Sequence, residues 1–186
     1  MKKLLAAALA LAVATPALAR KVAGVEFPDS VEVGGQRLVL NGAGLRKKFI
    51  IKVYAGGLYV PQRAKDPATI VAVDAPKRVR MVFLRTVSKT QIMNAYREGF
   101  EKNSDGPGLR DLLLKLDQIA PTIPAELKEG AEMSVTYVPG EGTTVAASEG
   151  GRQAIVAGKE FADALFKNWL GSAPADEDLK AALLGK

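Results

Sequence analysis

The sequence predicts an α+β fold in which an antiparallel sheet carries its helices on one face. Three observations lead to this prediction. Short segments rich in β-branched residues come first, two amphipathic helical segments follow, and a second group of strands precedes the C-terminal helices. The sequence shows no regular alternation of strand and helix, which is the pattern typical of a parallel, Rossmann-type sheet.

The predicted strands of the N-terminal half follow one another closely. The longest, residues 46–60, is rich in β-branched and aromatic residues and ends at Pro61. We interpret Gly42-Ala43-Gly44 as a tight turn or bulge that leads into this strand, because a phosphate-binding glycine loop would be followed by a helix. The other strands predicted in this half are Val22–Phe27, Ser30–Val33, Arg37–Leu40, Thr69–Val73 and Arg78–Leu84.

Two helices are predicted after these strands. The first runs from Ser88 to Asn103, and Ser88 with Gln91 forms a capping box at its start. The second has leucines at helical spacing between Leu109 and Ile119. The remaining predicted elements are strands at 133–137, 143–147 and 152–156, a helix at 159–170, and a short final helix that ends at Leu184.

Residues 1–19 have the pattern of a cleavable signal peptide. Lys2 and Lys3 precede an apolar run, and Ala17-Leu18-Ala19 gives the small-x-small pattern that signal peptidase accepts. The run is shorter than the roughly 20 apolar residues that span a bilayer. The sequence therefore predicts export to the periplasm, a single domain of residues 20–186, and no transmembrane segment after cleavage.

The composition excludes several kinds of chemistry. The chain has no histidine and no cysteine. Ser-His catalysis, thiol catalysis and metal sites built from these residues are therefore excluded, and we expect no cofactor and no metal. The formal net charge of the whole chain is +6. A mild excess of this kind favours small anionic ligands or membrane surfaces and does not indicate nucleic acid.

Arg46 and Tyr54 are the candidate ligand-binding residues. If residues 46–54 form one regular strand, the two side chains point to the same face, together with Lys48, Ile50 and Lys52. A guanidinium and a phenol hydroxyl can hold a carboxylate or a phenolate. A basic strand partly wetted by solvent gives the same pattern, so spacing alone leaves both interpretations open. We interpret Tyr96, Phe100 and Trp169 as core residues, because they lie at helical spacing.

The stretch from Asn41-Gly-Ala-Gly-Leu-Arg46 through Phe49-Ile50 to Lys52-Val-Tyr54-Ala-Gly-Gly57-Leu-Tyr59 resembles the chalcone isomerase family. The C-terminal Ala157-Gly-Lys-Glu-Phe-Ala and Trp169-Leu-Gly-Ser resemble its bacterial, exported branch. The resemblance implies an open-faced β-sandwich, in which a helical layer covers a large antiparallel sheet and a ligand cleft lies between them.

The resemblance also implies a role for each candidate residue. The family's plant enzymes close a flavanone ring by intramolecular Michael addition, and their arginine, which binds the substrate oxyanion, matches Arg46. Tyr54 stands where the enzymes have a threonine, whereas fatty-acid-binding members pair the arginine with a tyrosine to take a carboxylate. The enzymes' catalytic tyrosine and lysine fall at Thr90 and Met93 here, and neither matches.

We therefore expect a non-catalytic protein that binds an amphipathic anion, such as a fatty acid, in the cleft between sheet and helices. Two alternatives stay open. One is an isomerase acting on a chalcone-like or other enone, with Arg46 stabilising an oxyanion. The other is a partner-binding module of the cell envelope without a small ligand, although the sequence identifies no protein partner.

Overall fold

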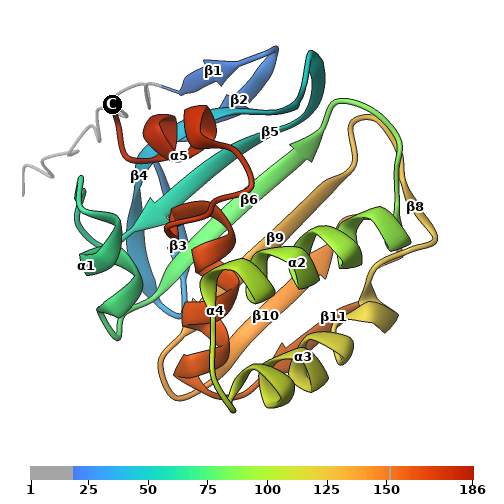
Figure 1. Cartoon of the computed structure of the whole chain (residues 1–186). Helices are drawn as coiled ribbons and strands as arrows, with labels where there is room; N and C mark the ends of the chain where they lie inside the picture. The colour runs from blue at the N-terminus through green and yellow to red at the C-terminus, as the bar shows by residue number, and fades with distance from the viewer. Residues whose placement is uncertain (1–18, 151) are drawn as a thin grey trace, which may run out of the picture.

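The computed structural model describes residues 19–150 and 152–186 (Figure 1). The predicted signal peptide, apart from Ala19, lies outside the described residues, so its cleavage stays a prediction. Among the described helices, none has the combination of length and hydropathy that spanning a membrane requires.

The centre of the fold is a seven-stranded sheet in the order β11-β10-β9-β6-β5-β4-β3. Every neighbouring pair is antiparallel, as predicted. The strands are β3 (Ser30–Val33), β4 (Gln36–Lys48), β5 (Ile51–Val60), β6 (Lys77–Phe83), β9 (Glu132–Val138), β10 (Gly142–Ala147) and β11 (Gln153–Val156). Two small ribbons pair β1 (Arg20–Val22) with β2 (Val25–Phe27), and β7 (Val87–Ser88) with β8 (Glu126–Leu127).

A helical layer covers one face of this sheet (Figure 1). It consists of α2 (Lys89–Asn103), α3 (Leu109–Asp117) and α4 (Lys159–Leu170), with a 3-10 turn at Ala120–Thr122. The predicted capping box of α2 is present, because the Gln91 amide donates to Ser88 Oγ at 3.2 Å and the Ser88 amide donates to Gln91 Oε1 at 3.0 Å. The predicted α+β class is confirmed.

The sheet has a core on each face, since successive side chains of a strand point to opposite sides. Leu58 of β5 belongs to the large core beneath the helices. Tyr59, the next residue, belongs to a smaller cluster with Phe27 of β2 on the opposite face. The first of the two faces carries the candidate site described below.

The predicted strand Thr69–Val73 is wrong, because this segment is helical: α1 spans Pro67–Ala72. The preceding Asp66 caps the helix by accepting a hydrogen bond from the Thr69 amide at 2.8 Å, and Pro67 fits the first turn. At the other end, the Lys77 ammonium donates to three carbonyl oxygens at 2.8–2.9 Å, those of Ile70, Val71 and Val73. Capping outweighs the β-propensity of the threonine, isoleucine and valine side chains.

The predicted long strand 46–60 is also wrong, because it is interrupted by a hairpin turn. β4 ends at Lys48, β5 begins at Ile51, and Phe49 and Ile50 form the turn. Phe49 adopts a φ of 57°, a region that favours glycine and asparagine. A turn without glycine, proline, asparagine or aspartate carries no signal in the sequence. The predicted segment Val22–Phe27 is also divided, here by a turn at Ala23 and Gly24 between β1 and β2.

Gly42 and Gly44 lie within β4 and do not form the tight turn that was one of the two interpretations. The pairing of β4 with β5 shifts register between Leu40 and Gly42, as the bulge interpretation predicts. The glycines make room for α5 (Glu177–Leu183): a Cβ on Gly42 would lie 2.1 Å from the Ala182 carbonyl oxygen, and one on Gly44 would lie 2.4 Å from the Ala182 Cβ.

Candidate functional site

A cavity of about 550 Å³ lies on the helical side of the sheet. Its walls come from β4, β5, β6 and β9 on one side and from α2 and α4 on the other. The size is ordinary for a small-molecule site. The buried floor is formed by Tyr54, Met81, Phe83, Ile92, Tyr96, Met133 and Trp169, and the exposed mouth by Lys47, Lys48, Phe49, Ile51, Arg85, Gln91, Asn94 and Glu98. The cavity therefore has an apolar interior and a charged entrance.

The structure places Arg46 and Tyr54 together in this cavity. They are cross-strand partners in the β4–β5 hairpin, and the Arg46 guanidinium carbon lies 5.6 Å from the centroid of the Tyr54 ring. The two side chains share a face because the hairpin pairs them, not because they lie eight residues apart on one strand. Of the residues predicted to share this face, Lys48 lines the cavity together with Arg46, whereas Ile50 and Lys52 do not, because the turn and a register shift after Arg46 interrupt the single strand that the prediction assumed.

The Tyr54 hydroxyl is buried and held by one hydrogen bond. It accepts from the indole Nε1 of Trp169 at 2.8 Å, and its ring meets Phe83 edge-on with centroids 5.7 Å apart. Burial raises the pKa of Tyr54, although the Arg46 charge opposes that change. The phenol is therefore protonated at neutral pH. No acceptor for its proton is found among the described residues, so the O–H group is available to a ligand.

Two further donors in the cavity are buried without a partner in the described part of the chain: Arg46 Nε and the Tyr96 hydroxyl. Burial raises the pKa of Tyr96 well above its usual 10, and the nearby Tyr54 adds to the rise while Arg46 opposes it. A buried polar group without a partner costs about 1–3 kcal/mol. Two other buried atoms without a partner among the described residues, Tyr59 Oη and Thr143 Oγ1, belong to residues outside the cavity lining.

Arg46, Tyr54 and Tyr96 therefore present one positive charge and two neutral O–H donors to the same space. A carboxylate accepts hydrogen bonds through both oxygens and is suited to this set. Asp176, whose charge adds to the rise in the pKa of Tyr54, already accepts two backbone hydrogen bonds, from the Lys47 amide at 2.8 Å and the Leu179 amide at 2.9 Å.

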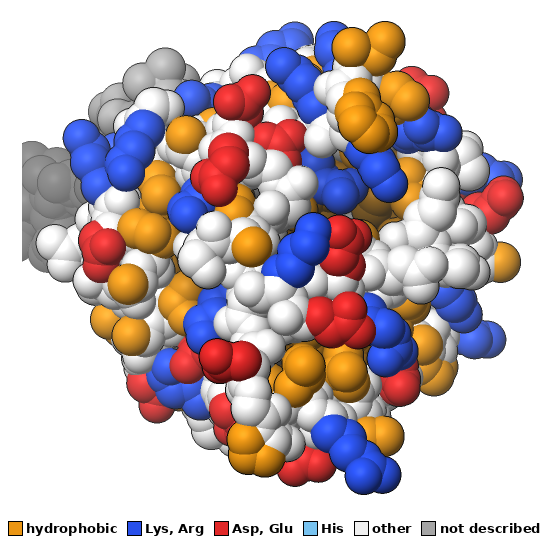
Figure 2. Space-filling view, in the orientation of Figure 1, with side chains coloured by type: hydrophobic (Ala, Val, Ile, Leu, Met, Phe, Trp, Pro, Cys, Tyr) orange, Lys and Arg blue, Asp and Glu red, His pale blue; other side chains and the backbone are white. Residues whose placement is uncertain are grey.

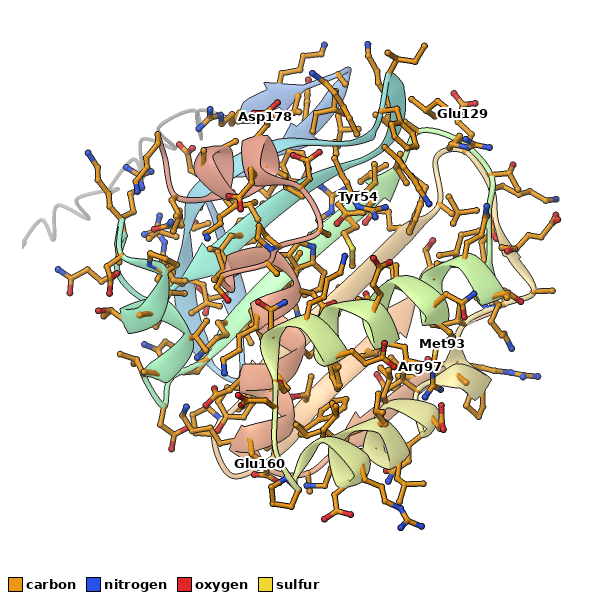
Figure 3. The ribbon with its side chains drawn as sticks, viewed as in Figure 1. Tyr54, Met93, Arg97, Glu129, Glu160 and Asp178 are labelled. Carbon is orange, nitrogen blue, oxygen red and sulfur yellow. The ribbon has the colours of Figure 1, made fainter. Side chains whose placement is uncertain are left out.

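Tyr96 and Trp169 are site residues that the sequence interpretation assigned to the core alone. Both are buried, and both also line the cavity. The missed signal is chemical, because a buried tyrosine hydroxyl or indole N–H needs a hydrogen-bond partner. In Figure 3, Tyr54 lies on the sheet, while Met93 and Arg97 lie on α2. Arg97 is paired with Asp117 at 2.7 Å.

Thr90 and Met93 stand at the positions where the enzymes of the family have their tyrosine and lysine. Both residues lie on α2, outside the cavity lining. Within residues 19–150 and 152–186, no three histidine, cysteine, aspartate or glutamate side chains are placed to hold a metal ion.

Comparison with known proteins agrees with this architecture. No curated protein matches the chain in sequence. Among solved structures, a fatty-acid binding protein of Arabidopsis thaliana superposes with a TM-score of 0.60 at 18% sequence identity, covering 88% of this chain and 96% of that chain. The model of the family described as chalcone isomerase-like matches residues 19–185. The chain therefore belongs to the chalcone isomerase-like family.

Proposed function

We propose that this protein is exported and that it binds, without catalysis, an amphipathic anion such as a fatty acid in the cavity between the sheet and the helices. One observation carries the proposal: Arg46, Tyr54 and Tyr96 present unused donors inside a cavity whose floor is otherwise mostly apolar. A head group with a negative charge and an apolar tail match these two environments.

The floor supplies the affinity for the tail. Met81, Phe83, Ile92 and Met133 are buried side chains, of which the methionines adapt to irregular chains. Each methylene removed from water contributes about 0.8 kcal/mol, which is about fourfold in affinity. The affinity should therefore rise by about this factor per added methylene until the cavity is filled.

Two observations support this function over an isomerase. Thr90 and Met93 lie outside the lining, so the positions that correspond to the enzymes' tyrosine and lysine contribute nothing to the cavity. The structural neighbour from Arabidopsis is a fatty-acid binding protein, which supports fatty acids as the first ligands to test.

The fluorescence of Trp169 provides the test. Trp169 is the chain's single tryptophan, and its indole nitrogen donates a hydrogen bond to the Tyr54 hydroxyl in the cavity. The mature protein is titrated with saturated fatty acids of increasing length, and the matched primary alcohols serve as controls. We expect a saturable change in tryptophan fluorescence with the acids, and binding at least tenfold weaker with the alcohols. Equal binding of acid and alcohol, or no saturable change, would contradict the proposal.

Two further measurements address catalysis and export. Incubation with chalcones and a wider panel of enones should give no rate above background, and a clear rate would show that the protein is an isomerase. Sequencing the N-terminus of protein recovered from the periplasm should give Arg20 as the first residue. Retention in the cytoplasm with an intact N-terminus would contradict export.

A further inference from the structure

The tip of the β4–β5 hairpin, residues 49–51, exposes hydrophobic side chains to solvent. Phe49 is 90% exposed, Ile50 94% and Ile51 45%. Scattered single apolar residues are ordinary on a surface, whereas these three are consecutive and lie at the end of a hairpin. Figure 2 shows hydrophobic side chains projecting at this end of the hairpin, with basic side chains beneath them.

The backbone of the tip is strained at Phe49. Phe49 has a φ of 57°, which is strained for an aromatic residue and ordinary for glycine or asparagine. With 90% of its surface exposed, the Phe49 side chain gains little from contacts within the chain that would offset the strain. Backbone strain of this kind is found at functional segments.

Basic side chains surround the tip. Lys47 and Lys48 precede it on β4, Lys52 follows it on β5, and all three are exposed. Within the described residues, none of the three has a carboxylate within salt-bridge distance. The pKa of Glu98 at the cavity mouth is lowered chiefly by its hydrogen bond and ion pair with Lys102 at 2.6 Å, and the charge of Lys48 adds a smaller effect.

An apolar tip with a basic collar matches the two layers of an anionic bilayer surface. Apolar side chains enter the boundary between head groups and acyl chains, and lysines remain at the phosphates. We propose that the β4–β5 tip is a membrane-docking element, in which Phe49 and Ile50 enter an anionic bilayer and Lys47, Lys48 and Lys52 contact its head groups.

The same tip borders the cavity. Lys47, Lys48, Phe49 and Ile51 form part of its mouth, so a docked hairpin turns the entrance towards the lipid. This arrangement would let an amphipathic ligand pass between bilayer and cavity without crossing water. Docking goes beyond the proposed function and does not depend on it, because a ligand-free protein would bind the bilayer in the same way.

The experiment measures co-sedimentation of the mature, ligand-free protein with vesicles. One set is an equal mixture of phosphatidylglycerol and phosphatidylethanolamine, and the other is phosphatidylcholine alone. We expect binding to the anionic vesicles that weakens as salt is added, because the Debye length falls from about 10 Å at 0.1 M to about 3 Å at 1 M. Binding to phosphatidylcholine should be at least tenfold weaker.

Matched variants locate the docking surface. Ile50→Asp should lower vesicle binding at least tenfold, whereas Ile155→Asp, on an isoleucine of β11 that is 57% exposed, should leave it within twofold. Lys52→Glu should lower binding more than tenfold, since each basic charge near an anionic surface contributes about fivefold. Lys65→Glu, beyond the opposite end of β5, should change it much less.

Ile50 and Lys52 are not part of the cavity lining, so their variants should keep the fatty-acid affinity of the wild type. Loss of docking and loss of ligand binding are thereby measured separately. Three results would overturn the docking proposal: no binding to anionic vesicles, equal vesicle binding by the wild type and Ile50→Asp, or a protein dimer that Ile50→Asp converts to monomers without any vesicle binding.

Discussion

Replacing Arg46 with methionine should weaken ligand binding and leave the fold as stable as before, or more stable. The two effects have opposite signs because Arg46 is poorly satisfied in the ligand-free fold. Its Nε is buried without a partner in the described part of the chain, and its guanidinium contacts the ring of Tyr54 at 5.6 Å. Methionine keeps the apolar stem and removes both the unpaired donor and the charge.

The size of each effect follows from these contacts. Loss of the cation–π contact costs about 0.5–1 kcal/mol, and removal of the unpaired buried donor returns about 1–3 kcal/mol. The free energy of unfolding should therefore stay the same or rise by up to about 2.5 kcal/mol. A hydrogen bond to a charged group contributes about 1.5–3 kcal/mol, so the affinity for a fatty acid should fall about 10- to 150-fold.

The assay combines urea denaturation with the Trp169 fluorescence titration on the same samples. Arg37→Met is the control, because Arg37 lies on the same strand and is exposed. It should change neither quantity by more than about 0.5 kcal/mol. A loss of more than 2 kcal/mol of stability in Arg46→Met, with the fatty-acid affinity unchanged, would show that Arg46 is a structural residue and would refute the reasoning.

Three further predictions concern the scaffold. Gly42→Ala should cost at least about 2 kcal/mol of unfolding free energy in urea denaturation, because the new Cβ would meet the backbone of α5. Gly108→Ala is the control and should be nearly neutral, because a Cβ there meets nothing within 4 Å. Lys77→Met should cost about 2 kcal/mol by thermal and urea unfolding, because three carbonyl oxygens of the α1 end lose their donor; a variant of wild-type stability would refute this role. Burial and the hydrogen bond to Asp74 raise the pKa of Tyr137 to about 12, above its ordinary 10. The stability that the protonated Tyr137 hydroxyl contributes is therefore fully present below pH 10 and is lost as pH rises through 12. Spectrophotometric titration of Tyr137→Phe against the wild type checks this value, and identical titration curves would contradict it.

The elements predicted correctly are those whose signals are local. The capping box at Ser88 and Gln91 acts over a few residues, and the structure shows it. The errors arise where a local pattern is ambiguous. Residues 69–73 are rich in β-branched side chains, yet the cap at Asp66 makes them helical. The turn at Phe49 and Ile50 contains no residue that favours turns, so it could not be read from the sequence.

The site was predictable in part. Arg46 and Tyr54 could be chosen from their chemistry, but their proximity depends on a hairpin pairing that the single-strand interpretation missed. Tyr96 and Trp169 reach the cavity from α2 and α4, and their contact with the sheet is a tertiary property. Helical spacing identifies such residues as buried and does not distinguish the wall of a cavity from a filled core.

The most direct test of the proposed binding function is the ionisation of a bound carboxyl group. Dodecanoic acid labelled with carbon-13 at its carboxyl carbon is followed by NMR across a pH titration, free and bound. If Arg46, Tyr54 and Tyr96 hold the carboxylate, the bound acid should titrate at a lower pH than the free acid, and Arg46→Met should remove most of that difference. A bound carboxyl that titrates at the same pH as the free acid, or at a higher pH, would show that the head group lies elsewhere and would contradict the account.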